Sequence, residues 1–97
     1  MQVLRRTRFV ADLAEAHAYI AERDPVAAER LLDDVEAIAS LLSLFPELGR
    51  RRDELRMGVR SVVVRRYRHV LFYRHQEATI VLLRLLHGAR EARTKLF

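Results

Sequence analysis

Residues 69–87 decide the fold of this chain, and they read HVLFYRHQEATIVLLRLLH. Over 69–74, successive side chains alternate with a period of two, which is typical of a β-strand. The residues at 75–78 predict a turn. The run at 79–87 is almost continuously apolar, as expected for a central strand that is buried on both faces of a sheet. The stretch therefore predicts two antiparallel strands joined by a short turn.

A third strand is expected upstream of this stretch. The period of two begins at residue 55, after a polar loop over 50–54, and continues into three valines at 62–64. Its alternation is carried by Leu55, Arg56, Met57, Val59 and Arg60. Residues 65–67 then predict the turn into the next strand. The last three strands would form an antiparallel sheet.

The N-terminal half has helical periodicity. Apolar residues recur every three or four positions from Phe9 to Ile20, and again from Ala28 to Leu42. Thr7 is a candidate cap for the first helix. Asp24 and Pro25 predict the start of the second, because aspartate is a good N-cap and proline suits the first helical position. This second helix is expected to run to about residue 43.

Because the segment between the two helices is so short, the helices are predicted to form an antiparallel hairpin. A strand is expected ahead of them, at 2–6. The order β-α-α-β-β-β indicates an α+β fold in which the helical hairpin packs on an antiparallel sheet. Residues 1–97 are expected to form one domain, since no linker or repeat interrupts the pattern.

Charge is distributed unevenly along the chain. Residues 1–49 contain five arginines and nine acidic residues, whereas residues 50–97 contain thirteen basic and four acidic residues, within a net charge of +5. The cationic half indicates an anionic partner, either nucleic acid or an acidic protein segment, although a solvated basic surface is the plainer interpretation. Lys95 is the only lysine. Because arginine does not readily release its proton, the composition favours binding over acid–base chemistry.

Other classes are disfavoured by composition. The chain has no cysteine, which excludes a disulfide framework and a cysteine-based zinc site. The four histidines have no spacing that suits a metal, so no metal site and no cofactor are expected. We see no signal peptide and no apolar run near the roughly 20 residues of a membrane span. The expected location is therefore the cytoplasm, without membrane association.

Several segments, in this order, resemble ParE toxins of the RelE/ParE superfamily of type II toxin–antitoxin systems. They are Phe45-Pro46-Glu47-Leu48-Gly49, Leu55-Arg56, Gly58-Val59-Arg60-Ser61, Val70-Leu71-Phe72-Tyr73-Arg74 and the run from Ile80 through His87-Gly88-Ala89-Arg90. The resemblance implies the RelE/ParE fold and a toxin that inhibits DNA gyrase by binding, without catalytic residues. It also implies a ParD-like antitoxin, encoded alongside, that places a helix on the helical hairpin and a strand at the sheet. Plasmid stabilisation and higher-order toxin–antitoxin assemblies belong to the same expectation.

Two sets of site residues follow. By resemblance, the C-terminal end acts on the target, which assigns target binding to His87, Arg90 and Arg93. The residues assigned to antitoxin binding are Leu32, Leu42, Arg56, Arg60, Tyr73 and Arg74. For Leu32 and Leu42 the sequence leaves open whether the side chain belongs to the core or to a contact surface. For Tyr73 we favour packing within the sheet with the hydroxyl at the rim, rather than stacking on a nucleic-acid base.

The main alternative is a RelE-like toxin that cleaves mRNA on the ribosome. Arg56, Arg60 and Arg84 would contact the phosphate in such an enzyme, and His87 is the only late proton-transfer candidate. The strands contain no lysine and the C-terminal residues no tyrosine, which disfavours this alternative. A plain nucleic-acid-binding module and a non-toxic relative that binds only an antitoxin or nucleic acid also remain open. The run at 50–52 is either a solvated loop or a contact for an acidic segment or a phosphate backbone.

Overall fold

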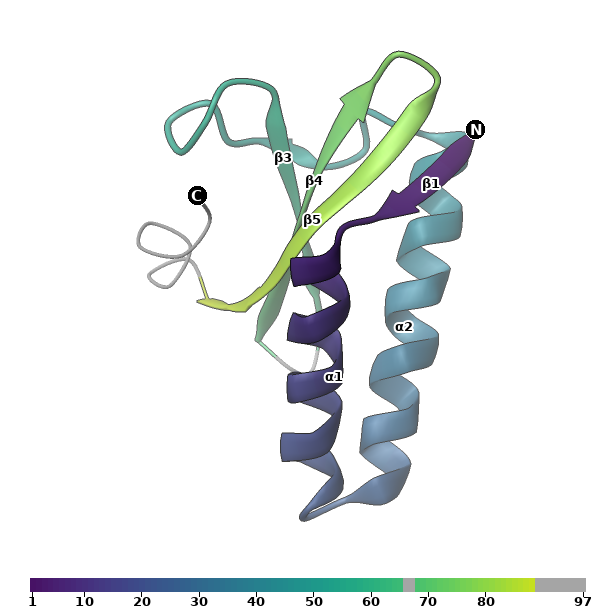
Figure 1. Ribbon diagram of the computed structural model, residues 1–97, viewed down its shortest axis with the longest axis vertical. Coiled ribbons are helices and arrows are strands. Elements are labelled where there is room, and N and C mark those ends of the chain that lie inside the picture. Colours follow the sequence, from purple (N-terminus) through teal and green to yellow (C-terminus); the bar gives the residue numbers. More distant parts are fainter. Residues whose placement is uncertain (66–67, 89–97) are drawn as a thin grey trace.

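The computed structural model describes residues 1–65 and 68–88. Its elements are β1 (Gln2–Arg5), α1 (Thr7–Ala21), α2 (Pro25–Leu44), β2 (Arg50–Arg51), β3 (Val59–Val64), β4 (His69–Gln76) and β5 (Thr79–His87). The two helices lie side by side as a hairpin next to one sheet of order β1-β5-β4-β3-β2 (Figure 1). Strands β2 to β5 pair antiparallel, whereas β1 pairs parallel with β5. The predicted α+β class and the helical hairpin are confirmed, and the sheet is mixed because of β1.

The helix starts differ in how they are capped. The side chain of Asp24 accepts a hydrogen bond from the backbone N–H of Ala27 at 3.0 Å, and Pro25 opens α2, as predicted. The prediction that Thr7 caps α1 is wrong. Thr7 is already the first helical residue, and the N-cap is Arg6, whose extended backbone provides no side-chain cap.

The region before β3 also corrects the sequence analysis. Residues 52–58 form a compact turn region instead of the start of a strand, and β3 begins at Val59. The carboxylate of Asp53 accepts the backbone N–H of Gly58 at 3.0 Å, and Gly58 has φ +83°, which glycine adopts without strain. The predicted polar loop at 50–54 instead contributes the two residues of β2, which pair with Arg60 and Ser61.

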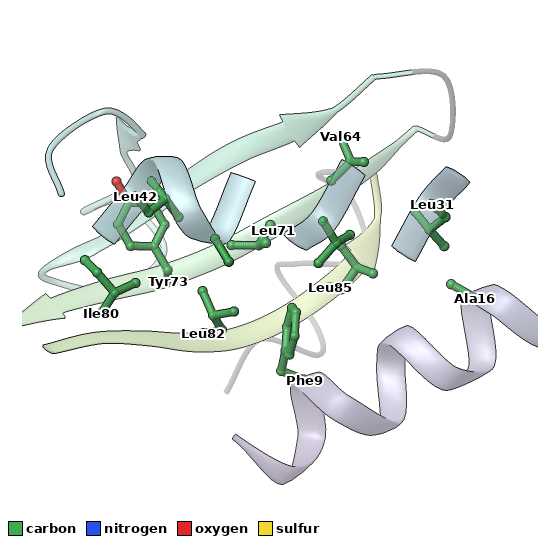
Figure 2. Close-up of a cluster of buried hydrophobic side chains, with 12 residues drawn as sticks. Phe9, Ala16, Leu31, Leu42, Val64, Leu71, Tyr73, Ile80, Leu82 and Leu85 are labelled. Atoms are coloured by element: carbon green, nitrogen blue, oxygen red, sulfur yellow. The ribbon is translucent and has the colours of Figure 1, made fainter. Parts of the chain in front are cut away.

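The hydrophobic core lies between the helical hairpin and the sheet. Phe9 of α1, Leu31 and Leu42 of α2, and Leu71 and Leu82 of the sheet meet there and are all at most 1% exposed (Figure 2). On β4 and β5, successive side chains point to opposite faces of the sheet. A second, smaller cluster therefore forms on the other face, from Val59, Val70, Phe72 and Leu86, and Leu55 from the 52–58 turn region packs against it.

Strand β5 extends over the residues that the sequence predicted, and it contributes to both clusters. Its pairing with β4 shifts by one residue between Phe72 and Tyr73, so that Phe72 faces Arg84 and Tyr73 faces Leu82. The shift leaves Leu83 as an extra residue in β5, as in a β-bulge. After it, Leu85 packs in the main core on the helix side of the sheet.

Candidate functional site

Tyr73 holds the loop that follows α2. Its side chain is fully buried, and its hydroxyl donates to the carbonyl of Pro46 and accepts the N–H of Gly49, both at 2.8 Å. Burial raises the pKa of this phenol above its usual value, against the opposing effect of the Gly49 hydrogen bond. A Cβ on residue 49 would lie 2.6 Å from the tyrosine ring, so only glycine fits there. The favoured interpretation of Tyr73 as a packed residue agrees with this geometry.

Arg60 holds the same loop from the neighbouring strand. Its guanidinium donates to the carbonyl of Gly49 at 2.9 Å and to that of Glu47 at 3.3 Å. Two segments that carry the family resemblance, 45–49 and 70–74, are thus bonded to each other through Tyr73. We conclude that Tyr73 and Arg60 maintain the fold of this loop, and that the assignment of the buried Tyr73 to a contact surface is not supported.

The two leucines assigned to antitoxin binding lie in different environments. Leu42 is fully buried in the main core, which resolves its open assignment in favour of the core (Figure 2). Leu32 is half-buried on the same helix. Only Leu32 therefore keeps a side chain that a partner can reach.

A cationic cleft lies where the start of α1 approaches strands β4 and β5 and the 52–58 turn region. Its volume is about 490 Å³, and its lining residues are Arg6, Thr7, Arg8, Arg56, Arg74, Leu83 and Arg84. The structure thus brings together Arg56, Arg74 and Arg84, which the sequence analysis had named separately. The cleft also includes Arg6 and Arg8, which come from the acidic half of the chain. We call this feature the arginine cleft.

Arg84 is fixed in the cleft by Asp12 of α1. The guanidinium donates to both carboxylate oxygens, from Nε at 2.7 Å and from Nη2 at 3.0 Å, and the two side chains are only 13% and 14% exposed. The same carboxylate accepts the backbone N–H of Leu85 at 3.0 Å. Strand β1 pairs with β5 only as far as Leu82, so Asp12 satisfies a backbone donor beyond the end of β1. Sequence reasoning missed Asp12 because its partners are more than seventy residues away.

A second hollow lies between α2 and the edge of the sheet. Its volume is about 370 Å³, and its lining residues are Asp34, Ala37, Ile38, Val62, Val63, Val64 and Arg65. Strand β2 pairs with β3 only at residues 60 and 61, so within the described chain the outer edge of residues 62–64 faces this hollow without a neighbouring strand. Val63 is 61% exposed. We call this feature the β3-edge groove.

The arginines at 51 and 52 form local ion pairs. Arg51 donates to Asp53 at 2.8 Å, and Arg52 donates to Glu54 at 2.7 Å while its guanidinium lies 5.9 Å from the centre of the Phe72 ring. The N–H of Gly58, with help from Arg51, holds the pKa of Asp53 below its ordinary value. Much of the charge of this run is therefore balanced within the turn region.

The predicted target-binding residues lie at the end of β5 and beyond it. His87 is exposed, and its ring meets that of His69 edge to face, with centroids 5.2 Å apart. Arg90 and Arg93 lie outside the described residues. Within residues 1–65 and 68–88, no three histidine or acidic side chains gather in a way that would hold a metal, and neither helix is long and apolar enough to cross a membrane.

Comparisons with known proteins agree with the class of fold that this geometry defines. A family model described as "ParE toxin of type II toxin-antitoxin system, parDE" matches residues 3–92. Toxin ParE3 of Caulobacter vibrioides is 33% identical over 88 residues, which cover 90% of this chain and 86% of that protein. A solved structure titled "Chromosomal ParDE TA system from P. aeruginosa" superposes with a TM-score of 0.78 at 20% identity, over 91% of this chain and 96% of the other. The chain belongs to the ParE toxin family of type II toxin–antitoxin systems.

Proposed function

We propose that this chain is a toxin that inhibits DNA gyrase by binding it, and that a ParD-like antitoxin neutralises it in the cytoplasm. The observation that carries the first part is the chemistry of the arginine cleft. Its described lining offers arginine, threonine and leucine side chains, and the nearby Asp12 is held in three hydrogen bonds. Cleavage of RNA through its 2′-hydroxyl needs a group that accepts a proton and another that donates one. Such a lining supports binding over catalysis.

A supercoiling assay with purified gyrase tests this proposal against the ribonuclease alternative. The purified chain should reduce supercoiling of relaxed plasmid in proportion to its concentration. Addition of the ParD-like protein encoded beside it should restore the activity. Unchanged supercoiling, together with cleavage of mRNA on translating ribosomes, would instead establish a RelE-like enzyme.

The β3-edge groove supports the antitoxin part of the proposal. Among the residues that the structure describes, no strand pairs with the outer edge of β3 at 62–64, and an extended segment of another protein pairs readily with such an edge. Ile38 and Val62 are partly buried apolar residues at this place, so side chains of that segment would find an apolar surface beside the edge. We propose that the C-terminal part of the antitoxin adds a strand to β3 here, with Leu32 of α2 available to its helical part.

Substitution of Val63 tests this contact. Val63→Asp should weaken antitoxin binding at least about tenfold, which corresponds to about 1.4 kcal/mol, because it places a charge on an apolar contact. Leu4→Asp is the matched control, since Leu4 is also exposed (49%) but lies on β1, at the opposite edge of the sheet. Calorimetric titration of both variants with the antitoxin provides the measurement. Equal affinities for the two variants would place the antitoxin elsewhere.

A further inference from the structure

The arginine cleft concentrates positive charge from distant parts of the chain. Five arginines line a space of about 490 Å³: two from the start of α1, one from the 52–58 turn region, one from β4 and one from β5. Asp12 balances the charge of Arg84. Arg6 and Arg8 make no ion pair within the described part of the chain. Arg6 and Arg8 therefore bring positive charge to the cleft that no ion pair in the described part of the chain balances.

One guanidinium of the cleft is held in a fixed position. Two hydrogen bonds that Arg84 donates to the carboxylate of Asp12 orient its guanidinium, and both side chains are mostly buried. A guanidinium held in this way loses little further side-chain entropy when it binds a ligand. Arg74 is also restrained, since it donates to the carbonyl of Met57 at 3.4 Å. Part of the cleft is therefore organised before any ligand arrives.

The start of α1 contributes a second kind of donor to the same space. The first N–H groups of a helix have no acceptor within the helix, and the helix dipole places partial positive charge there. In α1, the N-cap Arg6 supplies no side-chain cap and the first turn has no acidic residue. Arg6 and Arg8 add positive charge at the end of the helix where positive charge is unfavourable. A bound anion would relieve this repulsion and accept the free N–H groups.

From this arrangement we propose that the arginine cleft is a binding site for phosphate groups. Guanidinium groups bind phosphate oxygens through paired hydrogen bonds, and several of them around one space favour a ligand with more than one negative charge. Diphosphates and the phosphodiester backbone of a nucleic acid share this chemistry, whereas a single carboxylate side chain brings only one charge. The proposal does not depend on gyrase being the target.

Inorganic pyrophosphate is the first probe, titrated calorimetrically into the full-length chain. We expect saturable one-site binding in the wild type. The variants Arg8→Gln and Arg74→Gln should each weaken it at least about fivefold. Arg23→Gln should bind like the wild type, since Arg23 is exposed in the link between the helices and its loss changes the net charge equally. Circular dichroism spectra that match the wild type would show that the variants are folded.

Two results would overturn the proposal. One is absence of saturable binding by the wild type, and the other is an equal loss of affinity in Arg8→Gln and Arg23→Gln, which would indicate only the net charge. A short polyglutamate peptide tests whether the cleft binds carboxylates instead of phosphates. If the peptide binds as tightly as pyrophosphate and is equally sensitive to Arg8→Gln, the site is for carboxylates and the phosphate assignment is wrong.

A labelled single-stranded oligonucleotide separates the two sources of phosphate. If it binds with an affinity that falls steeply with salt, is displaced by pyrophosphate and is weakened by Arg8→Gln, the natural ligand is a nucleic-acid backbone. If pyrophosphate binds and the oligonucleotide does not, the ligand is a free phosphate compound. Both results support a phosphate site, and neither requires the supercoiling assay to succeed.

Discussion

At the scale of single residues, the contacts of Tyr73 show why a family motif is a poor guide to a binding surface. The sequence places Tyr73 beside Arg74 in a basic strand, which is compatible with an exposed contact. In the structure its hydroxyl joins two backbone groups of the loop at 46–49, and its ring leaves no room for a side chain at Gly49. The order of the motifs along the chain identifies the family. Their contacts with each other depend on folding and cannot be read from their order.

Removal of this hydroxyl gives a prediction with a defined dependence on pH. Tyr73→Phe should lower the free energy of unfolding by about 1–2 kcal/mol at neutral pH, since it leaves two backbone partners in the loop unsatisfied. The raised pKa of Tyr73 means that the folded protein favours the protonated phenol. The contribution of the protonated hydroxyl to the free energy of unfolding is complete below the pKa of the unfolded state, near 10. It is lost as the pH rises through the pKa of Tyr73 in the folded state.

The measurement is urea unfolding of both proteins between pH 8 and 11, followed by circular dichroism. The gap in stability between wild type and Tyr73→Phe should narrow above about pH 10. Leu48→Ala serves as a control in the same loop, because its side chain is exposed and carries no charge that would act on Tyr73. A gap that stays constant over this range would contradict the assigned role of the hydroxyl.

At the scale of elements, the sequence predicted those with strong periodicity, and the errors fall where a local contact overrides the pattern. Strand β5 and the start of α2 at Asp24 and Pro25 are as expected, because an apolar run and a capping pair are local signals. The alternation at 55–58 also resembles a strand. There the hydrogen bond from Gly58 to Asp53 and the positive φ of Gly58 turn the chain instead. The two-residue β2 exists only through its pairing with β3, which no local pattern reveals.

Asp12 connects α1 to β5, and its loss should uncouple them. Asp12→Ala should lower the free energy of unfolding by about 2–4 kcal/mol, because it removes the carboxylate that pairs with the mostly buried Arg84 and accepts the N–H of Leu85. Glu15→Ala, an exposed acidic position on the same helix, should change stability by less than about 0.5 kcal/mol. Chemical denaturation of both variants provides the comparison. If Asp12→Ala lowered the free energy of unfolding as little as Glu15→Ala does, the ion pair would not stabilise the fold.

At the scale of the whole molecule, folding mixes the two halves that the sequence separates by charge. From the sequence, the anionic partner is attributed to the cationic half of the chain. The arginine cleft instead combines Arg6 and Arg8 from the acidic half with three arginines from the cationic half. The positions of these two arginines follow from the end of β1 beside β5, where the N–H of Arg6 donates to the carbonyl of Leu82 at 3.1 Å. Charge counted along the chain therefore predicted an anionic partner but not the composition of the place where it would bind.

The same mixing predicts that the chain unfolds as one unit. Residues of both helices and of three strands share a single core cluster, and the Cα radius of gyration of 12.8 Å agrees with the roughly 13 Å expected for one domain of about 100 residues. A helical hairpin without the sheet would expose Phe9, Leu31 and Leu42 to water, so it should not persist alone. Helical circular dichroism and tyrosine fluorescence should therefore give one coincident transition in urea. If tyrosine fluorescence changed at a lower urea concentration than helical circular dichroism, the sheet and the hairpin would fold separately.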